Sequence, residues 1–173
     1  MVTTFVTAAI IWHHMKTTIN KNYNYFKMKP IDIVIDFDGT CVTHDFPKVG
    51  KDIGAVPVLK RLVEAGHNLI LFTMRSDISN PTSKDPDIHC QGGKYLTDAV
   101  NWFKKHDIPL YGIQSNPDQK SWTTSPKAYG HLIIDDAALG CPLKFDENIS
   151  NRPFVDWEKV QQYLDWAGIT IPF

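Results

Sequence analysis

The chain has 173 residues, of which 43% are hydrophobic and 21% charged, as in an ordinary globular domain. We predict a single folded domain, because this length is enough to bury a core. The net charge of −1 argues against a nucleic-acid or membrane-surface partner recruited by bulk electrostatics. The three cysteines are widely spaced and form no CxxC pair, so neither a zinc site nor a disulfide framework is expected. We therefore predict a reducing, cytoplasmic compartment.

The N-terminal residues 1–29 differ from the rest of the chain. Residues 2–12 are mostly apolar and residues 16–29 are mostly polar, and an apolar run of 11 residues is too short to span a bilayer. Lys16 follows this run, whereas a secretory signal has basic residues before it. We interpret residues 1–29 as a poorly ordered extension, or as sequence upstream of a start at Met28. Residues 30–173 are then the folded domain.

Short apolar runs alternate with amphipathic stretches along the rest of the chain. The runs predict strands at four places, residues 31–36, 68–73, 110–114 and 131–135. Helical spacing of apolar residues predicts helices at residues 54–65, from Leu96 to about His106, and within residues 151–168. Between them lies a long polar loop, residues 76–93. This alternation predicts an α/β, Rossmann-like three-layer fold with a central parallel sheet covered on both faces.

Residues whose side chains could bind a ligand or take part in catalysis follow the predicted strands. Asp36 and Asp38 end the first strand, Thr73 ends the second, and Asp135 and Asp136 end the fourth. Ligands of open parallel sheets bind beyond the carboxyl ends of the strands, at the point where the strand order reverses. We therefore expect these side chains to share one site at that edge of the sheet.

The segment Asp36-Phe37-Asp38-Gly39-Thr40 places two carboxylates close together at the end of a buried strand. Such a pair is costly through repulsion and desolvation, which a hard cation such as Mg²⁺ would offset. We predict Asp36 as a nucleophile and Asp38 as a general acid and then base. Gly39 would let the chain turn sharply. The alternative is a strand end with capping aspartates and a turn glycine.

Hydroxyl and cationic residues complete the expected site. Thr73 and the backbone N–H groups beside it would bond a phosphoryl oxygen, although a threonine after a strand is often only a turn residue. Arg75 would hold a substrate anion with its planar fork, or else be a surface arginine. Met74, between them, is expected to line the substrate site, as are Gly39 and Thr40.

The fourth predicted strand supplies the remaining candidates. Lys127, eight residues before Asp135, would offset charge between nucleophile and phosphoryl group. Lys120 competes with it for that role. Neighbouring residues point in different directions, so we expect Asp136 as the direct metal ligand and Asp135 as its support, or as a shared ligand.

Together these residues resemble the motifs of the haloacid dehalogenase (HAD) superfamily of aspartate-nucleophile phosphohydrolases. That superfamily has an apolar strand followed by DxDGT, a second followed by Thr or Ser, a lysine, and a last strand followed by two acids. The chain offers, in this order, Asp36-Phe37-Asp38-Gly39-Thr40, Thr73, Lys127 and Asp135-Asp136. The resemblance covers about residues 30–166.

The resemblance implies a Rossmann-like fold, Mg²⁺ dependence and phosphoryl transfer to water, with a backbone carbonyl of Asp38 also binding the metal. Cap domains of the superfamily are inserted at points that correspond to residues 40–54 and 115–125, and both segments are too short for one. The chain is thus similar to capless, minimal members, and residues 76–93 would partly cover the open site. A Gly-Cys-Pro-Leu stretch at residues 140–143 is also similar to small uncharacterised bacterial and phage phosphatase-like proteins. Relatives often have arginine where this chain has Ala137.

We therefore expect a Mg²⁺-dependent phosphatase that hydrolyses a small or macromolecular phosphomonoester through an aspartyl-phosphate. A non-catalytic phospholigand- or protein-binding module on the same fold is the main alternative. Transfer to an acceptor other than water would call for a cap that excludes water. A nucleic-acid end-processing phosphatase is disfavoured by the charge. No membrane partner is expected, and the sequence does not indicate an oligomeric state.

Overall fold

The computed structural model describes residues 29–79 and 92–170. The predicted N-terminal extension lies outside the described residues except for Lys29, and so does most of the predicted loop at residues 76–93. Along the described part of the chain, no helix is both long and apolar enough to cross a bilayer.

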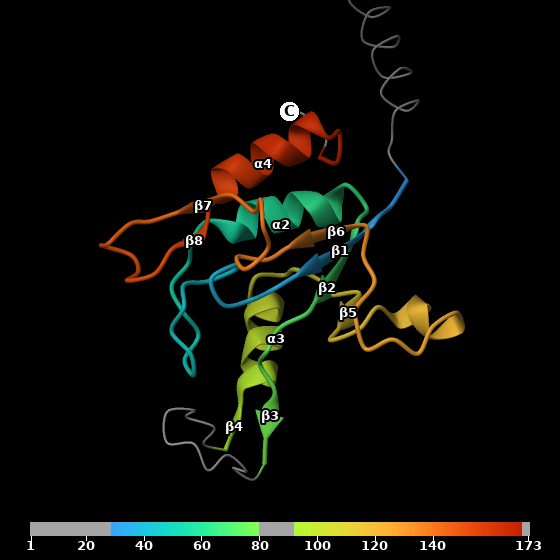
Figure 1. Ribbon diagram of the computed structural model, residues 1–173, viewed down its shortest axis with the longest axis horizontal. Coiled ribbons are helices and arrows are strands. Elements are labelled where there is room, and N and C mark those ends of the chain that lie inside the picture. Colours follow the sequence, from blue (N-terminus) through green and yellow to red (C-terminus); the bar gives the residue numbers. More distant parts are fainter. Residues whose placement is uncertain (1–28, 80–91, 171–173) are drawn as a thin grey trace, which may run out of the picture.

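The central sheet has four parallel strands in the order β5-β2-β1-β6 (Figure 1). They are β1 (Asp32–Ile35), β2 (Asn68–Leu71), β5 (Gly112–Ile113) and β6 (Leu132–Ile134). All four predicted strands are confirmed, each shorter than predicted. The chain runs from β1 through β2 to β5 in one direction and returns to β6 on the other side of β1. The strand order therefore reverses between β1 and β6.

Three helices flank this sheet, as the α/β pattern predicted. They are α2 (Ala55–Glu64), α3 (Tyr95–Lys105) and α4 (Trp157–Trp166). Gly66, at a φ of +92°, follows α2 in the left-handed conformation that favours glycine. The central parallel sheet with flanking helices confirms the predicted Rossmann-like α/β fold. The described residues contain no inserted cap domain.

The two sheet faces are covered differently. Side chains alternate between faces along a strand, and Ile33, Ile35, Leu69 and Leu71 join the helices in the main buried core. Val34 and Ile70 face the other way and pack with Ala128 in a second, smaller cluster. The second face is thus covered by the connection from β5 to β6, which contains a 3₁₀ helix, η1 (Pro117–Ser121).

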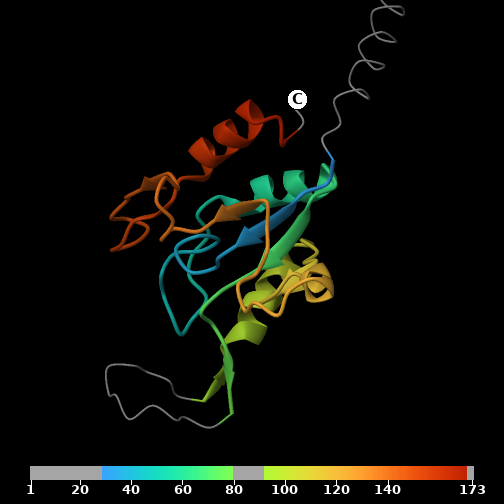
Figure 2. The same cartoon turned by 45° about the vertical axis from the view of Figure 1, so that its right-hand side comes forward.

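Two short antiparallel pairs were not predicted. One joins β3 (Asp77–Ile78) to β4 (Gly93–Lys94), at the two ends of the predicted polar loop. The other joins β7 (Leu143–Lys144) to β8 (Phe154–Val155), before α4. Both views place the β3–β4 pair at the end of the molecule far from α4 (Figures 1 and 2). Strands of two residues have too few positions for an alternating pattern to show.

Candidate active site

Three carboxylates meet at the carboxyl ends of β1 and β6. Asp36, Asp135 and Asp136 each offer one oxygen, and these oxygens lie within 4.8 Å of one another. The strand register explains the meeting, because Ile35 lies beside Ile134 and the next amide, from Asp36, donates to the Ile134 carbonyl at 3.1 Å. The acids thus gather where the strand order reverses, as the sequence predicted for the site.

Burial makes Asp36 unusual among these acids. Desolvation, followed by the charges of Asp135, Asp136 and Asp38, raises the pKa of Asp36 from 3.8 to about 7, against a lowering hydrogen bond from the Phe37 backbone. Within the described residues neither Asp36 nor Asp135 forms an ion pair. Burial and the neighbouring acids therefore disfavour the ionised form of Asp36, and the hard oxygen ligands of the cluster suit a small divalent cation.

Thr40 forms hydrogen bonds with two of the clustered acids, Asp36 and Asp136. This fully buried residue donates its hydroxyl to Asp36 Oδ2 at 3.3 Å, and Thr40 Oγ1 accepts a hydrogen bond from the Asp136 amide at 3.0 Å. The Thr40 carbonyl accepts the indole N–H of Trp157 at 2.7 Å, which ties α4 to the site. The structure thus places the Thr40 hydroxyl against the acids rather than open to a substrate.

Gly39 lies where a side chain has no room. Its φ is +79°, and a Cβ would lie 2.2 Å from His44 Nε2 and 2.7 Å from Asp136 Oδ2. His44 Nε2 in turn contacts Asp136 Oδ2 at 3.0 Å. The close approach of the histidine and the acid therefore depends on glycine at this position.

Asp38 is not one of the three clustered acids, and its carboxylate is paired with Arg75. Its two oxygens accept hydrogen bonds from Arg75 Nε at 2.6 Å and Arg75 Nη2 at 2.7 Å. The Arg75 side chain is 1% exposed, so it is not a surface arginine. The structure therefore directs the Asp38 carboxylate to a buried guanidinium and not into the carboxylate cluster where a metal was predicted.

The loop after β2 is held by the end of β5. Gln114 accepts the Thr73 amide at 3.0 Å and donates to the carbonyls of Thr73 and Arg75 at 2.6 and 3.0 Å. The Thr73 hydroxyl accepts the Arg75 amide at 3.3 Å. Met74, predicted to line the substrate site, is 98% exposed and stands clear of this network.

Lys127 is not brought into contact with the acids. It is exposed, its carbonyl accepts from Gln119, and the next residue, Ala128, packs on the second face of the sheet. Its ammonium forms no ion pair with any described carboxylate, and the same is true of Lys120. Of the lysines and arginines that the structure describes, Arg75 is the one in contact with a site acid.

Two residues of the site were missed from the sequence. His44 shows no metal-ligand spacing with the other histidines, and its place in the loop after the Asp36–Thr40 motif is the one sequence signal that could have indicated it. Gln114 was treated as the end of a strand. Its φ of +60° is uncommon for a residue other than glycine, and such a conformation leaves no mark in the sequence.

The thiols near the site are not activated. Burial, followed by the charges of Asp36 and Asp38, raises the pKa of Cys41 well above its usual value, and its thiol donates to the Asp36 carbonyl at 3.2 Å. Burial also raises the pKa of Cys141. Both are free cysteines, and Cys90 lies outside the described residues.

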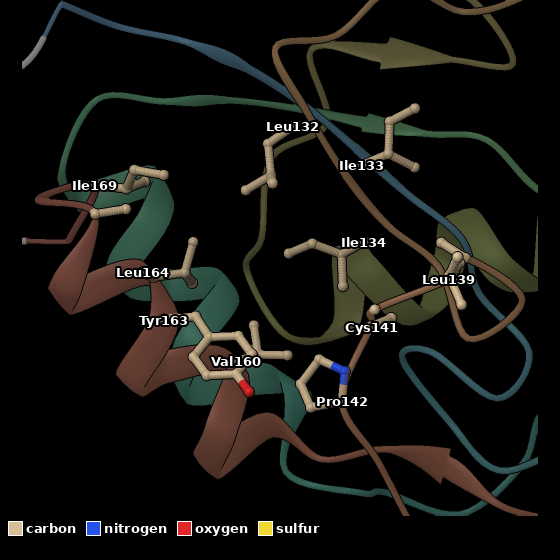
Figure 3. A pocket seen from close by; sticks show the side chains of 13 residues that line it. Leu132, Ile133, Ile134, Leu139, Cys141, Pro142, Val160, Tyr163, Leu164 and Ile169 are labelled. Atoms are coloured by element: carbon tan, nitrogen blue, oxygen red, sulfur yellow. The ribbon is translucent and has the colours of Figure 1, made fainter.

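An apolar pocket of about 390 Å³ opens elsewhere, between β6 and α4 (Figure 3). Leu132 and Ile134 contribute from the strand, and Val160 and Leu164 from the helix. None of the described residues that line it carries a carboxylate. The pocket therefore does not coincide with the acidic cluster.

Comparison with known proteins supports the fold. No family model matches the chain, and no curated protein matches it. Among solved structures, a conserved protein from Bacteroides thetaiotaomicron is similar, with 26% sequence identity and a TM-score of 0.58. The match covers 80% of this chain and 93% of that one. The shared α/β fold thus extends over most of both chains.

Proposed function

We propose that this protein is a Mg²⁺-dependent phosphatase of the HAD type, without a cap domain, that hydrolyses a phosphomonoester. The meeting of Asp36, Asp135 and Asp136 at the reversal of strand order is the observation that carries the proposal. These three carboxylates would hold the cation. Bound Mg²⁺ would offset the charge of the acids and of the phosphoryl oxygens.

The proposed reaction has two steps. A carboxylate oxygen of Asp36 forms a bond to phosphorus as the bond to the leaving oxygen breaks. The leaving oxygen keeps that electron pair and takes a proton from Asp38. Water then attacks phosphorus and gives a proton back to Asp38, and the bond to Asp36 breaks to release phosphate and the original carboxylate.

The test is turnover of 4-nitrophenyl phosphate with Mg²⁺ and with EDTA, in wild type and Asp36→Asn. We expect turnover that needs the cation and is lost in the variant, because an amide cannot serve as the nucleophile. Asp107→Asn is a matched control, since it removes an exposed carboxylate at a φ of +54° that asparagine tolerates. Full Mg²⁺-dependent turnover by Asp36→Asn would end the proposal. Tight phosphate binding without turnover of any phosphomonoester would instead favour a non-catalytic binding module.

A further inference from the structure

The guanidinium of Arg75 is fixed in place by several neighbours at once. Nε and Nη2 donate to the two oxygens of Asp38. Nη1 donates to the Pro47 carbonyl at 3.2 Å, and Nη2 also donates to the Lys48 carbonyl at 2.6 Å. The group also stacks against an aromatic ring in Phe37, 5.1 Å from its centroid.

This pattern leaves Arg75 little capacity to bind a substrate anion. Four of the five N–H groups that a guanidinium carries are engaged by Asp38, Pro47 and Lys48. The side chain is also buried. Its contacts serve the protein, which differs from the anion-binding role expected from the sequence.

The same contacts determine where Asp38 points. A planar fork that meets both carboxylate oxygens fixes the direction of the carboxyl plane, which a lysine ammonium would not do. Each oxygen keeps a second lone-pair site when Arg75 occupies the first. The fork therefore fixes the plane of the Asp38 carboxyl group and leaves one lone-pair site on each oxygen that Arg75 does not occupy.

We propose that Arg75 is a positioning residue that aims the Asp38 carboxyl at the leaving oxygen of the substrate. This inference rests on the proposed function, because it assigns Arg75 a part in the proton transfer that Asp38 performs. Arg75 also donates to the carbonyls of Pro47 and Lys48, and these bonds hold the loop after the Asp36–Thr40 motif beside the Asp38 carboxyl group.

The test compares two leaving groups in Arg75→Lys, which keeps the charge and removes the fork. A nitrophenolate leaves without needing a proton, whereas an alkoxide needs one. We expect kcat to fall by about 100-fold for an alkyl phosphate and much less for 4-nitrophenyl phosphate, with KM little changed. Arg152→Lys, at an exposed arginine, is the control and should behave as wild type.

Asp38→Asn makes the comparison specific. It should show the same dependence on the leaving group, and adding Arg75→Lys to it should cost little more. Equal losses for both substrates, or losses that multiply in full, would overturn the inference and leave the proposed function standing. A wild type without turnover would instead overturn the proposed function.

A second variant keeps the test decisive if Arg75→Lys does not fold. Gln114→Met removes the hydrogen bond to the Arg75 carbonyl and the two to Thr73, and it keeps the guanidinium and its charge. A displaced Thr73 would slow both substrates alike, so the ratio of the two kcat values is the quantity to compare. We expect the same preference for the aryl substrate, to a smaller degree. A Gln114→Met enzyme with an unchanged ratio of the two kcat values would count against the inference.

Discussion

At the residue scale, Gly39 has no room for a side chain beside the acidic cluster. We predict that Gly39→Ala destabilises the fold by more than about 1 kcal/mol, because alanine disfavours a positive φ and its methyl group would strike His44 and Asp136. Gly140→Ala is the matched control, since Gly140 has a φ of +92° and open space around it. Urea unfolding of both variants measures the difference. Equal losses would show that backbone strain alone explains the effect.

The raised pKa of Asp36 makes a second prediction, on pH and stability. An acid whose pKa is about 7 when folded and 3.8 when unfolded contributes stability below pH 4, and this contribution is lost as pH rises through 7. Without metal, Asp36→Asn should therefore match wild type near pH 4 and exceed it above pH 7. A tenfold change in a proton-binding constant corresponds to about 1.4 kcal/mol, so the gap should approach about 4 kcal/mol at most.

Thermal unfolding in EDTA between pH 4 and 8 measures this gap. Asp107→Asn should show no comparable trend with pH, because its carboxylate is exposed. If the stability advantage of Asp36→Asn over wild type instead shrinks as pH rises, the fold favours the ionised form of Asp36. Burial and the neighbouring acids would then not raise its pKa.

At the element scale, the edge of the sheet that carries the clustered acids depends on α4 as well as on the strands. Trp157 reaches from the first residue of this helix to the Thr40 carbonyl. We predict that Trp157→Phe destabilises the protein by about 1–3 kcal/mol, because a buried carbonyl loses its donor. Trp166→Phe, at a residue 78% exposed, should change stability little. The denaturant midpoints of the two variants at an unchanged m value make the comparison.

Strands and helices with a regular apolar pattern could be predicted from the sequence. The meeting of the acids that follow the strands could be predicted as well. β1, β2 and β6 are apolar runs with acids or Thr73 just beyond, so the sequence indicated both the sheet and the edge where Asp36, Asp135 and Asp136 meet. The pairing of Arg75 with Asp38 was not predictable. It joins loops 37 positions apart through side-chain conformations that no local pattern records.

The contact between His44 and Asp136 escaped prediction for the same reason, with a separation of 92 positions. Lys127 illustrates the opposite case, a predicted neighbour of the acids that forms no ion pair with them. Its distance in sequence from Asp135 suggested proximity to the acids, yet the β5–β6 connection runs over the second face of the sheet, and the buried side chains of Asn116 and Gln119 hold it there. Motif order constrains which residues can share a site and leaves their side-chain partners open.

At the scale of the whole molecule, one cation should stabilise the entire fold. Asp36 follows β1, and Asp135 and Asp136 follow β6, so a ligand that joins them couples the two strands on which the rest of the sheet is built. A ligand that binds only the folded state stabilises it by about 2.7 kcal/mol at 100 times its dissociation constant. We predict that Mg²⁺ raises the unfolding temperature by several degrees at pH 8, and less at pH 6, where Asp36 holds its proton.

Thermal unfolding at increasing Mg²⁺ measures this effect without any substrate. Asp136→Asn and Asp135→Asn should each abolish most of the shift, whereas Asp38→Asn should keep it, because the Asp38 carboxylate is bonded to Arg75. Asp107→Asn should shift as wild type does. A shift lost in Asp38→Asn but kept in Asp135→Asn would move the cation toward the Asp38 side of the site. In that case the three clustered carboxylates would need another explanation for their crowding.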